Sequence, residues 1–255
     1  MKRVDLNCDL GESFGNYTCG LDVQVIPQIS SANVACAFHA SDPLVMAKTV
    51  ALAKQHGVAV GAHPGYPDLV GFGRRNLAVS PAELKAMVQY QIGALRAFCD
   101  AQGLVMQHVK PHGAMYNMAA KDRKLADSIC EAIVEVDPKL ILLGLSGSQM
   151  LEAAEAAGLS WASEVFADRA YEDDGSLTPR SLPGSVIKDE ELAISRVLQM
   201  VQEGTVTARS GKTIPIRADS ICLHGDGEKA VEFAERIRQE LTAVGVQIVP
   251  LTELK

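Results

Sequence analysis

Residues 80–113, SPAELKAMVQYQIGALRAFCDAQGLVMQHVKPHG, contain one complete unit of the predicted fold. Ser80 can cap a helix while Glu83 reaches back to the cap, so we predict a helix that begins here. Gly103 ends this helix in a left-handed conformation that glycine adopts easily. Residues 105–109, in which Val105, Met106 and Val109 are apolar, then predict a strand. The stretch closes on polar residues, at the point where the strand becomes a loop.

The same unit recurs along the whole chain. Helix-stopping glycines follow amphipathic stretches and precede apolar runs at Gly57, Gly158, Gly204 and Gly245. Short apolar runs that alternate with helices are typical of βα units around a parallel sheet. The predicted strands are residues 4–7, 32–36, 58–62, 105–109, 140–145, 163–166, 220–223 and 246–249.

We therefore predict an α/β fold in which residues 1–255 form a single barrel domain. Two stretches interrupt the alternation. Residues 171–188 are rich in Asp, Gly, Ser and Pro, and residues 205–218 resemble a small hairpin around Ser210-Gly211-Lys212. Both are interpreted as loop excursions of the barrel.

The composition narrows the classes of partner. The chain has 255 residues, with 24 Lys and Arg against 31 Asp and Glu, and a net charge of -7. No basic run is present, which argues against a nucleic-acid partner. The six cysteines form no CxxC pair, so neither a disulfide framework nor a zinc ribbon is indicated. The N-terminal residues reach Asp5 without an apolar stretch of signal-peptide length, so we expect no export signal. No segment has roughly 20 apolar residues, so we also expect no membrane span, and a cytoplasmic location.

Polar and ionisable residues cluster directly after the apolar runs. In a parallel α/β barrel this edge carries the active site. A single histidine such as His63 or His224 is often a hydrogen-bonded core residue, and Asp42 or Asp226 can be a helix cap. Many buried polar groups in one region favour a functional pocket instead. The clusters are residues 5–12, 39–43, 61–65, 110–113 and 223–227.

Two further histidines are interpreted separately. His56 lies in the last turn of a helix, where a structural role is expected. His108 lies two residues before Lys110 in a strand run, so the two side chains should share a face. The sequence leaves open whether His108 supports the pocket or packs in the core.

One apparent nucleotide-binding motif does not match its full pattern. Gly211-Lys212-Thr213 resembles the end of a phosphate-binding P-loop, but Val206 stands where that loop requires glycine. We expect any ATP to be bound by another polypeptide.

These clusters, in this order, resemble the bacterial LamB/YcsF family, also known as the A subunits of 5-oxoprolinase. The resemblance implies a distorted (β/α) TIM-like barrel related to the polysaccharide deacetylases. It also implies partner subunits B and C, and ATP consumption during conversion of 5-oxoproline to L-glutamate. Ala37 and Ser41 stand where the family usually has glycine, so strain is expected there. The matching segments are residues 5–12, 31–43, 61–64, 108–113, 165–169, 179–181 and 222–227.

Ring opening of a lactam needs an activated carbonyl, a base for water and stabilisation of the developing oxyanion. We expect the partner subunits to supply a phosphorylated lactam. Asp9 or Glu12 is the candidate base, and Lys110 and His112 are expected to stabilise negative charge. Arg169 or Arg180 is expected to bind the substrate carboxylate. The other candidate substrate-binding residues are Asn7, Asn33, His39, His63, Asp168, His224 and Asp226.

Several alternatives stay open at this point. A divalent metal could be held by Asp5, His39, His63 and His224. The chain could be a stand-alone metal-dependent amidohydrolase or carbohydrate deacetylase, which would turn over without ATP. It could also be a non-catalytic carrier of a small acid. The sequence does not decide whether the chain forms a homo-oligomer.

Overall fold

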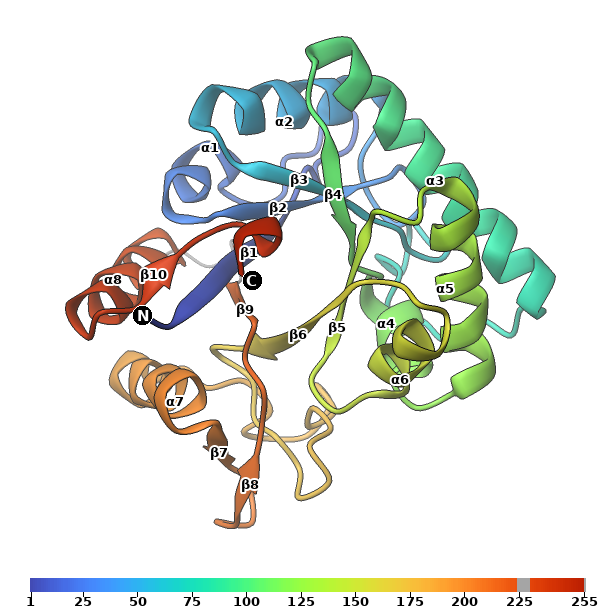
Figure 1. Cartoon of the computed structure of the whole chain (residues 1–255). Coiled ribbons are helices and arrows are strands. Elements are labelled where there is room, and N and C mark those ends of the chain that lie inside the picture. Colours follow the sequence, from blue (N-terminus) through green and yellow to red (C-terminus); the bar gives the residue numbers. More distant parts are fainter. Residues whose placement is uncertain (224–229, 255) are drawn as a thin grey trace.

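The computed structural model describes residues 1–223 and 230–254. In this part of the chain, parallel strands form a closed ring in the order β1-β2-β3-β4-β5-β6-β9, and β9 pairs back onto β1 (Figure 1). The ring confirms the predicted distorted (β/α) barrel. Its strands are β1 (Arg3–Leu10), β2 (Ser31–Ala35), β3 (Ala59–His63), β4 (Met106–Val109), β5 (Ile141–Leu145), β6 (Trp161–Phe166) and β9 (Ser220–Leu223).

The last predicted strand lies outside this ring. Strand β10 (Gln247–Ile248) is only two residues long and pairs with Arg3 and Val4, at the start of β1. Such a short strand extends one end of β1 and takes no full place in the barrel. All the strands predicted from the sequence are thus present.

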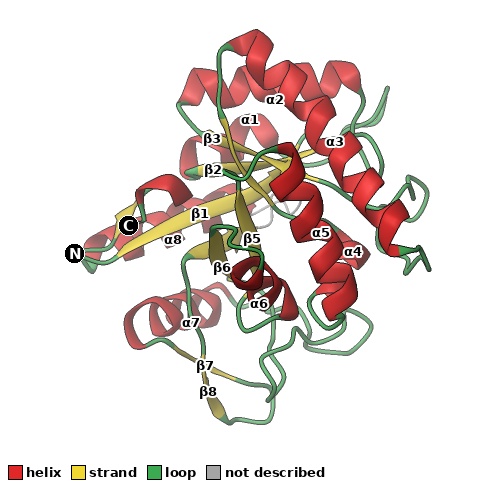
Figure 2. Cartoon of the chain, turned by 45° about the vertical axis from the view of Figure 1, so that its right-hand side comes forward, coloured by secondary structure: helices red, strands yellow, loops and turns green. Residues whose placement is uncertain are grey.

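Helices surround the barrel on its outside (Figures 1 and 2). Helix α3 packs against α2 and α5, α5 packs against α6, and α7 packs against α8. The helices are α1 (Asp22–Val25), α2 (Pro43–His56), α3 (Pro81–Gln102), α4 (Gly113–Ala119), α5 (Arg123–Val136), α6 (Gln149–Ala156), α7 (Glu190–Glu203) and α8 (Ala230–Ala243). The described residues also include the 3-10 turns η1 (Ile26–Gln28) and η2 (Leu251–Glu253). Among residues 1–223 and 230–254, none of these helices is both long and apolar enough to cross a membrane.

The local signals for helix ends are confirmed. Ser80 and Glu83 form the predicted capping box of α3, and Gly103 ends that helix with a φ of 68°. Gly204 ends α7 in the same way, also with a φ of 68°. These signals depend only on neighbouring residues, which is why the sequence reveals them.

The two predicted excursions have distinct structures. Strands β7 (Thr205–Thr207) and β8 (Thr213–Pro215) pair antiparallel and form the expected hairpin. Gly211 and Lys212 lie at its tip, so they are not part of a strand-to-helix phosphate loop. The segment between β6 and α7 is irregular, with isolated bridges such as that between Tyr171 and Leu177.

The barrel interior is polar, and the apolar core lies between the strands and the helices. Along β1 the outward residues Val4 and Leu6 belong to the main apolar cluster. The alternating residues Asp5, Asn7 and Asp9 make polar contacts with neighbouring strands instead. Successive residues of β1 therefore alternate between the apolar core outside the strands and the polar interior of the barrel.

An irregularity in β4 changes this alternation locally. Val60 pairs with Met106 and Gly61 pairs with His108, which leaves Gln107 without a partner in β3. A bulge of this kind lets two consecutive side chains face the same side. Gln107 accordingly donates to Ser31 and His108 contacts Asn33, both inside the barrel. The His108 ring also requires glycine at position 61, because an added Cβ there would lie 2.2 Å from it.

The loop after β2 has the backbone strain expected from the sequence. Ala37 has a φ of 68° and Ser41 a φ of 78°, both in the left-handed region. Non-glycine residues pay about 1–2 kcal/mol for this conformation. His39 lies between these two residues, so the strained loop positions a histidine of the predicted pocket.

Candidate active site

A cavity of about 760 Å³ opens at the carboxyl ends of the barrel strands. Asp9, Glu12, His63, Lys110 and His112 all contribute to its lining. They come from β1, β3 and β4 and from the residues that follow these strands. The structure thus brings these five predicted residues together at one mouth.

Lys110 lies between two carboxylates at the base of the cavity. Its Nζ is 2.9 Å from Asp9 Oδ1 and 2.8 Å from Glu164 Oε1. The Lys110 side chain is 3% exposed, and Tyr116 donates its hydroxyl to Glu164 Oε2 over 2.6 Å. Burial alone would lower the pKa of Lys110, but Asp9 and Glu164 outweigh it and hold the pKa well above its usual value. The lysine is therefore an ammonium ion.

The Asn33 amide orients the Asp9 side chain from below, and Asn7 helps to hold Asn33 in place. Asn33 Nδ2 donates to Asp9 Oδ1 over 2.9 Å and to Asn7 Oδ1 over 2.7 Å. His108 Nε2 donates to Asn33 Oδ1 over 2.7 Å, and burial lowers the pKa of His108 to about 3. Asn7 and Asn33 are fully buried, so they support the mouth and do not line it. His108 belongs to this supporting layer.

Asp5 occupies the floor of the barrel, away from the histidines. Ser30 and Ser31 donate to its Oδ1 over 2.7 and 2.6 Å, and Ser220 donates to its Oδ2. Burial raises the pKa of Asp5 to about 6 despite these hydrogen bonds. Of the four predicted metal ligands, Asp5 is therefore not among the residues whose ligand atoms converge with those of His39 and His63.

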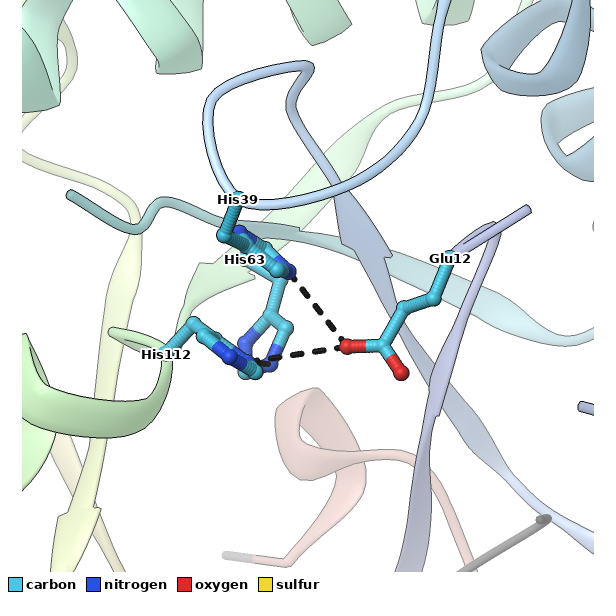
Figure 3. A group of neighbouring side chains, drawn as sticks. All are labelled: Glu12, His39, His63 and His112. Atoms are coloured by element: carbon cyan, nitrogen blue, oxygen red, sulfur yellow. Dashed lines mark hydrogen bonds and ion pairs between the residues drawn. The ribbon is translucent and has the colours of Figure 1, made fainter. Parts of the chain in front are cut away.

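Three histidine rings and Glu12 converge at the mouth (Figure 3). His39 Nε2 lies 3.3 Å from Glu12 Oε1, and His112 Nδ1 lies 3.6 Å from the same oxygen. The rings of His39 and His112 stack with centroids 3.7 Å apart. His63 Nε2 is 2.9 Å from His112 Nδ1 and 3.3 Å from Asp9 Oδ2. We call Glu12, His39, His63 and His112 the histidine cluster.

Backbone carbonyls fix the protons on two of these rings. His63 Nδ1 lies 2.7 Å from the Lys110 carbonyl, and His112 Nε2 lies 2.8 Å from the Phe72 carbonyl. A carbonyl only accepts, so each of these nitrogens must donate. The two nitrogens left over, His63 Nε2 and His112 Nδ1, face each other.

The two carboxylates at the mouth have opposite ionisation behaviour. Burial would raise the pKa of Asp9, but His63 and Lys110 outweigh it and hold the pKa well below its usual value. Burial and the charge of Asp9 together raise the pKa of Glu12. Neighbouring acids whose pKa values are pushed apart mark functional sites.

The segment after β6 supplies the positive side of the cavity. Arg169 and Arg180 both line it. Arg169 also holds its own loop together, because Nη2 donates to the Thr178 carbonyl over 2.6 Å and Nε to the Ser185 carbonyl over 3.2 Å. Burial and the nearby Arg180 lower the pKa of Arg169 to about 10. The carbonyl of Asp168 anchors the same segment by accepting from the Ile187 amide.

His224 and Asp226 lie outside the described residues. Their predicted roles in substrate or metal binding stay predictions. The potential metal ligands that converge in the described part of the chain are the four residues of the histidine cluster.

Sequence reasoning missed Glu164, Tyr116 and Phe72. Glu164 is fully buried in β6, and a single ionisable residue inside an apolar strand run was a usable signal. Tyr116 lies in α4, one turn after His112, and its hydroxyl has no signature in the sequence. Phe72 contributes a backbone carbonyl, which any residue type can provide.

Comparison with known proteins identifies the family. The LamB/YcsF family model matches residues 4–255. The chain belongs to the LamB/YcsF family. Among its curated relatives, the A subunit of 5-oxoprolinase from Clostridium beijerinckii is 65% identical over 254 residues and covers 100% of both chains. The Bacillus subtilis protein of the same name is 55% identical over 253 residues, covering 99% of this chain and 98% of its own.

Solved structures support the same family fold. The lactam utilization protein from Thermus thermophilus is 50% identical, covers 97% of this chain and 99% of its own, and superimposes with a TM-score of 0.92. The T48 deacetylase is 15% identical with a TM-score of 0.50, covering 99% of this chain and 90% of its own. At that identity the likeness concerns the fold alone, and it relates this LamB/YcsF barrel to deacetylase-type barrels.

Proposed function

We propose that this chain is the A subunit of an ATP-dependent 5-oxoprolinase and that its cavity carries out the ring-opening hydrolysis of the lactam. The observation that carries the proposal is full-length similarity, at 55–65% identity, to relatives named as the A subunit of 5-oxoprolinase. The cavity supports it, because acidic, basic and imidazole groups converge at the mouth of the barrel.

The chemistry adds one water to 5-oxoproline. The ring C–N bond breaks, the carbonyl carbon gains the hydroxyl of water, and the nitrogen gains the proton, which gives L-glutamate. An unactivated lactam is a resonance-stabilised amide and resists attack by water. Phosphorylation of the lactam oxygen by ATP, in partner subunits B and C, would make this carbon electrophilic. Attack of one water on this carbon and cleavage of the ring C–N bond would leave an acyl phosphate on the side chain of glutamate, and a second water would release inorganic phosphate and L-glutamate.

Asp9 is the base in this proposal. It is held ionised, its side chain is 23% exposed to the cavity, and Asn33 fixes its orientation. Glu12 contacts the rings of His39 and His112, so we assign it to the histidine cluster. A positioned general base accelerates a reaction by about 10²–10⁴-fold.

Lys110 acts through Asp9 in this account. Its ammonium is engaged by Asp9 and Glu164, so it holds the base ionised and in place. His112 uses its Nε2 on the Phe72 carbonyl, which leaves only Nδ1 directed at the cluster. The substrate carboxylate is assigned to the Arg180 side of the cavity, where a second cation, Arg169, adds to the positive field.

The nucleotide belongs to the partners in this proposal. Gly211 and Lys212 lie at the tip of the β7–β8 hairpin, not between a strand and a helix. Cys8, Cys36, Cys99, Cys130 and Cys222 are buried free thiols, which supports a cytoplasmic location.

Reconstitution tests the proposal. The purified chain is combined with subunits B and C, and 5-oxoproline-dependent ATP hydrolysis and glutamate release are measured with and without it. We expect glutamate only when all three are present. Equal glutamate release without this chain would identify it as dispensable or a carrier. Amide hydrolysis by the chain alone, without ATP, would identify a stand-alone hydrolase.

A further inference from the structure

We infer that Glu12, His39, His63 and His112 bind one divalent transition-metal ion of the Zn²⁺ type. The inference deepens the proposed function by giving its cavity a metal centre. It is drawn from the arrangement of these four side chains and not from the identity of the substrate.

Two imidazole lone pairs of the histidine cluster point at each other. His63 Nδ1 and His112 Nε2 donate to backbone carbonyls over 2.7 and 2.8 Å. In the neutral rings, His63 Nε2 and His112 Nδ1 are then both acceptors, yet they lie 2.9 Å apart. Two acceptors at this distance repel each other unless a positive group lies between them. Glu12 and Asp9 add two carboxylates beside the same point.

The potential ligand atoms of the histidine cluster have the spacing of a tetrahedral metal site. An ion bound at about 2.1 Å by four tetrahedral ligands leaves those ligand atoms about 3.4 Å apart. In the histidine cluster the measured separations are 2.9 Å for His63–His112, 3.3 Å for His39–Glu12 and 3.6 Å for His112–Glu12. The four ligand atoms all lie within 4.8 Å of one another. Little rearrangement is needed to enclose an ion.

The types of ligand in the histidine cluster, and the groups that hold them, also fit a Zn²⁺-type ion. Three imidazoles and one carboxylate suit Zn²⁺ and related ions, whereas Mg²⁺ and Ca²⁺ prefer oxygen ligands. Metal-binding histidines usually donate their other nitrogen to a carbonyl or carboxylate. His63 and His112 do so, while His39 Nδ1 is buried without a hydrogen-bond partner. His39 should therefore be the least firmly held ligand.

A bound ion of this kind would supply Lewis-acid polarisation at the mouth of the cavity. Asp9 lies beside the cluster, with Oδ2 3.3 Å from His63 Nε2. Its position next to the cluster, but outside it, keeps Asp9 available as the base.

The test uses the full chain after chelator treatment. Zn²⁺ is titrated in by calorimetry, and Co²⁺ binding is followed by visible absorption, which reports four-coordinate geometry. We expect one ion per chain, with a Kd in about the micromolar range or below. His63→Gln and His112→Gln should weaken binding by more than about 100-fold, and His39→Gln by about 10–100-fold. The control is His56→Gln, an exposed histidine of α2, which should bind as wild type does.

If neither Zn²⁺ nor Co²⁺ binds saturably to the wild-type chain, the inference is overturned. The close contact between His63 and His112 would then be explained by a proton shared between the two rings. Binding that survives all three histidine substitutions would also overturn it. Glu12→Gln provides a further variant if a histidine variant does not fold, as judged by thermal unfolding. Binding is measured without substrate or partner subunits. If the chain binds one ion but supports no glutamate release, only the proposed function is refuted. If the chain supports glutamate release but binds no ion, only the metal site is refuted.

Discussion

Asp5 and Asp9 lie four residues apart on the inward face of the same strand, yet their environments differ completely. Asp5, on the barrel floor, is surrounded by three serine hydroxyls, and burial raises its pKa to about 6. Asp9, at the mouth, lies beside Lys110 and His63, and its pKa is held well below the usual value. Burial at the floor thus disfavours the charged form of Asp5, whereas the cations at the mouth favour the charged form of Asp9. Two identical side chains on one strand therefore differ in pKa because cationic groups surround Asp9 and not Asp5.

The backbone shows the same division. Within residues 1–223 and 230–254, the non-glycine residues with positive φ are Ala37, Ser41 and Phe72. The first two flank His39, and the third provides the carbonyl that accepts from His112. Strained backbone tends to collect at functional sites, where surrounding structure holds it in place. These three strained residues therefore lie beside the histidines at the mouth of the barrel.

The largest expected effect is the loss of the cation at the mouth. Lys110→Met leaves Asp9 and Glu164 as uncompensated buried charges, so we expect the free energy of unfolding to fall by about 3–5 kcal/mol. Urea unfolding at pH 7 measures it. Adding Glu164→Gln to the variant should recover part of the loss. Lys85→Met, which removes a partly exposed partner of Glu131 and Glu135, is the control and should change little. Equal stability of Lys110→Met and wild type would show that Asp9 and Glu164 do not depend on the charge of Lys110.

Asp5, at the barrel floor, should make the free energy of unfolding depend on pH. The pKa of Asp5 is about 6 in the folded chain against an ordinary value of 3.8. Between these values the folded state holds a proton that the unfolded state has lost, so the Asp5 contribution to stability falls as pH rises from about 4 to 6. The loss is on the order of 3 kcal/mol. Asp5→Asn should remove this pH dependence, which urea unfolding at several pH values can measure. Parallel pH profiles for variant and wild type would contradict the assignment.

A smaller effect is expected where mouth and floor meet. Tyr116→Phe removes the hydroxyl that donates to Glu164, and leaves that buried carboxylate with Lys110 alone. We expect a loss of about 1–3 kcal/mol in unfolding free energy. Tyr90→Phe, at an exposed position of α3, is the matched control and should be neutral. A loss no greater than that of the control would show that Glu164 does not depend on the hydroxyl.

The smallest effect concerns backbone strain at the mouth. Ala37→Gly relieves a positive φ at an exposed position, but glycine also loses more entropy on folding. We expect a net stabilisation of about 0.5 kcal/mol. Ala51→Gly, at an exposed position inside α2, should instead destabilise by about 1 kcal/mol. Thermal unfolding of both variants gives the comparison, and the same sign at both positions would argue against strain at Ala37.

Much of the fold follows from local sequence signals. The capping box at Ser80 and the stop at Gly103 depend on residues that touch along the chain, so they were predictable. The site was predictable in outline, because residues that follow parallel strands meet at one edge. The family resemblance supplied the barrel type, and the strain predicted at Ala37 and Ser41 is present.

What the sequence did not reveal depends on contacts between distant residues. Closure of the ring by β9 and β1 leaves β10 outside, which strand propensity alone does not determine. The bulge at Gln107 turns two consecutive side chains inward and has no clear sequence marker. The separation of Asp5 from the histidines also follows from strand length: it precedes Asp9 by four residues, or about 13 Å along an extended strand.

The central claim is that reaction chemistry belongs to the mouth and not to the floor. Asp9→Asn and Asp5→Asn make the same chemical change on the same strand, so glutamate release by the complex reconstituted with subunits B and C compares the two regions directly. We expect Asp9→Asn to lower the rate by about 10²–10⁴-fold while Asp5→Asn keeps most of it. Equal rates in the two folded variants would contradict the account.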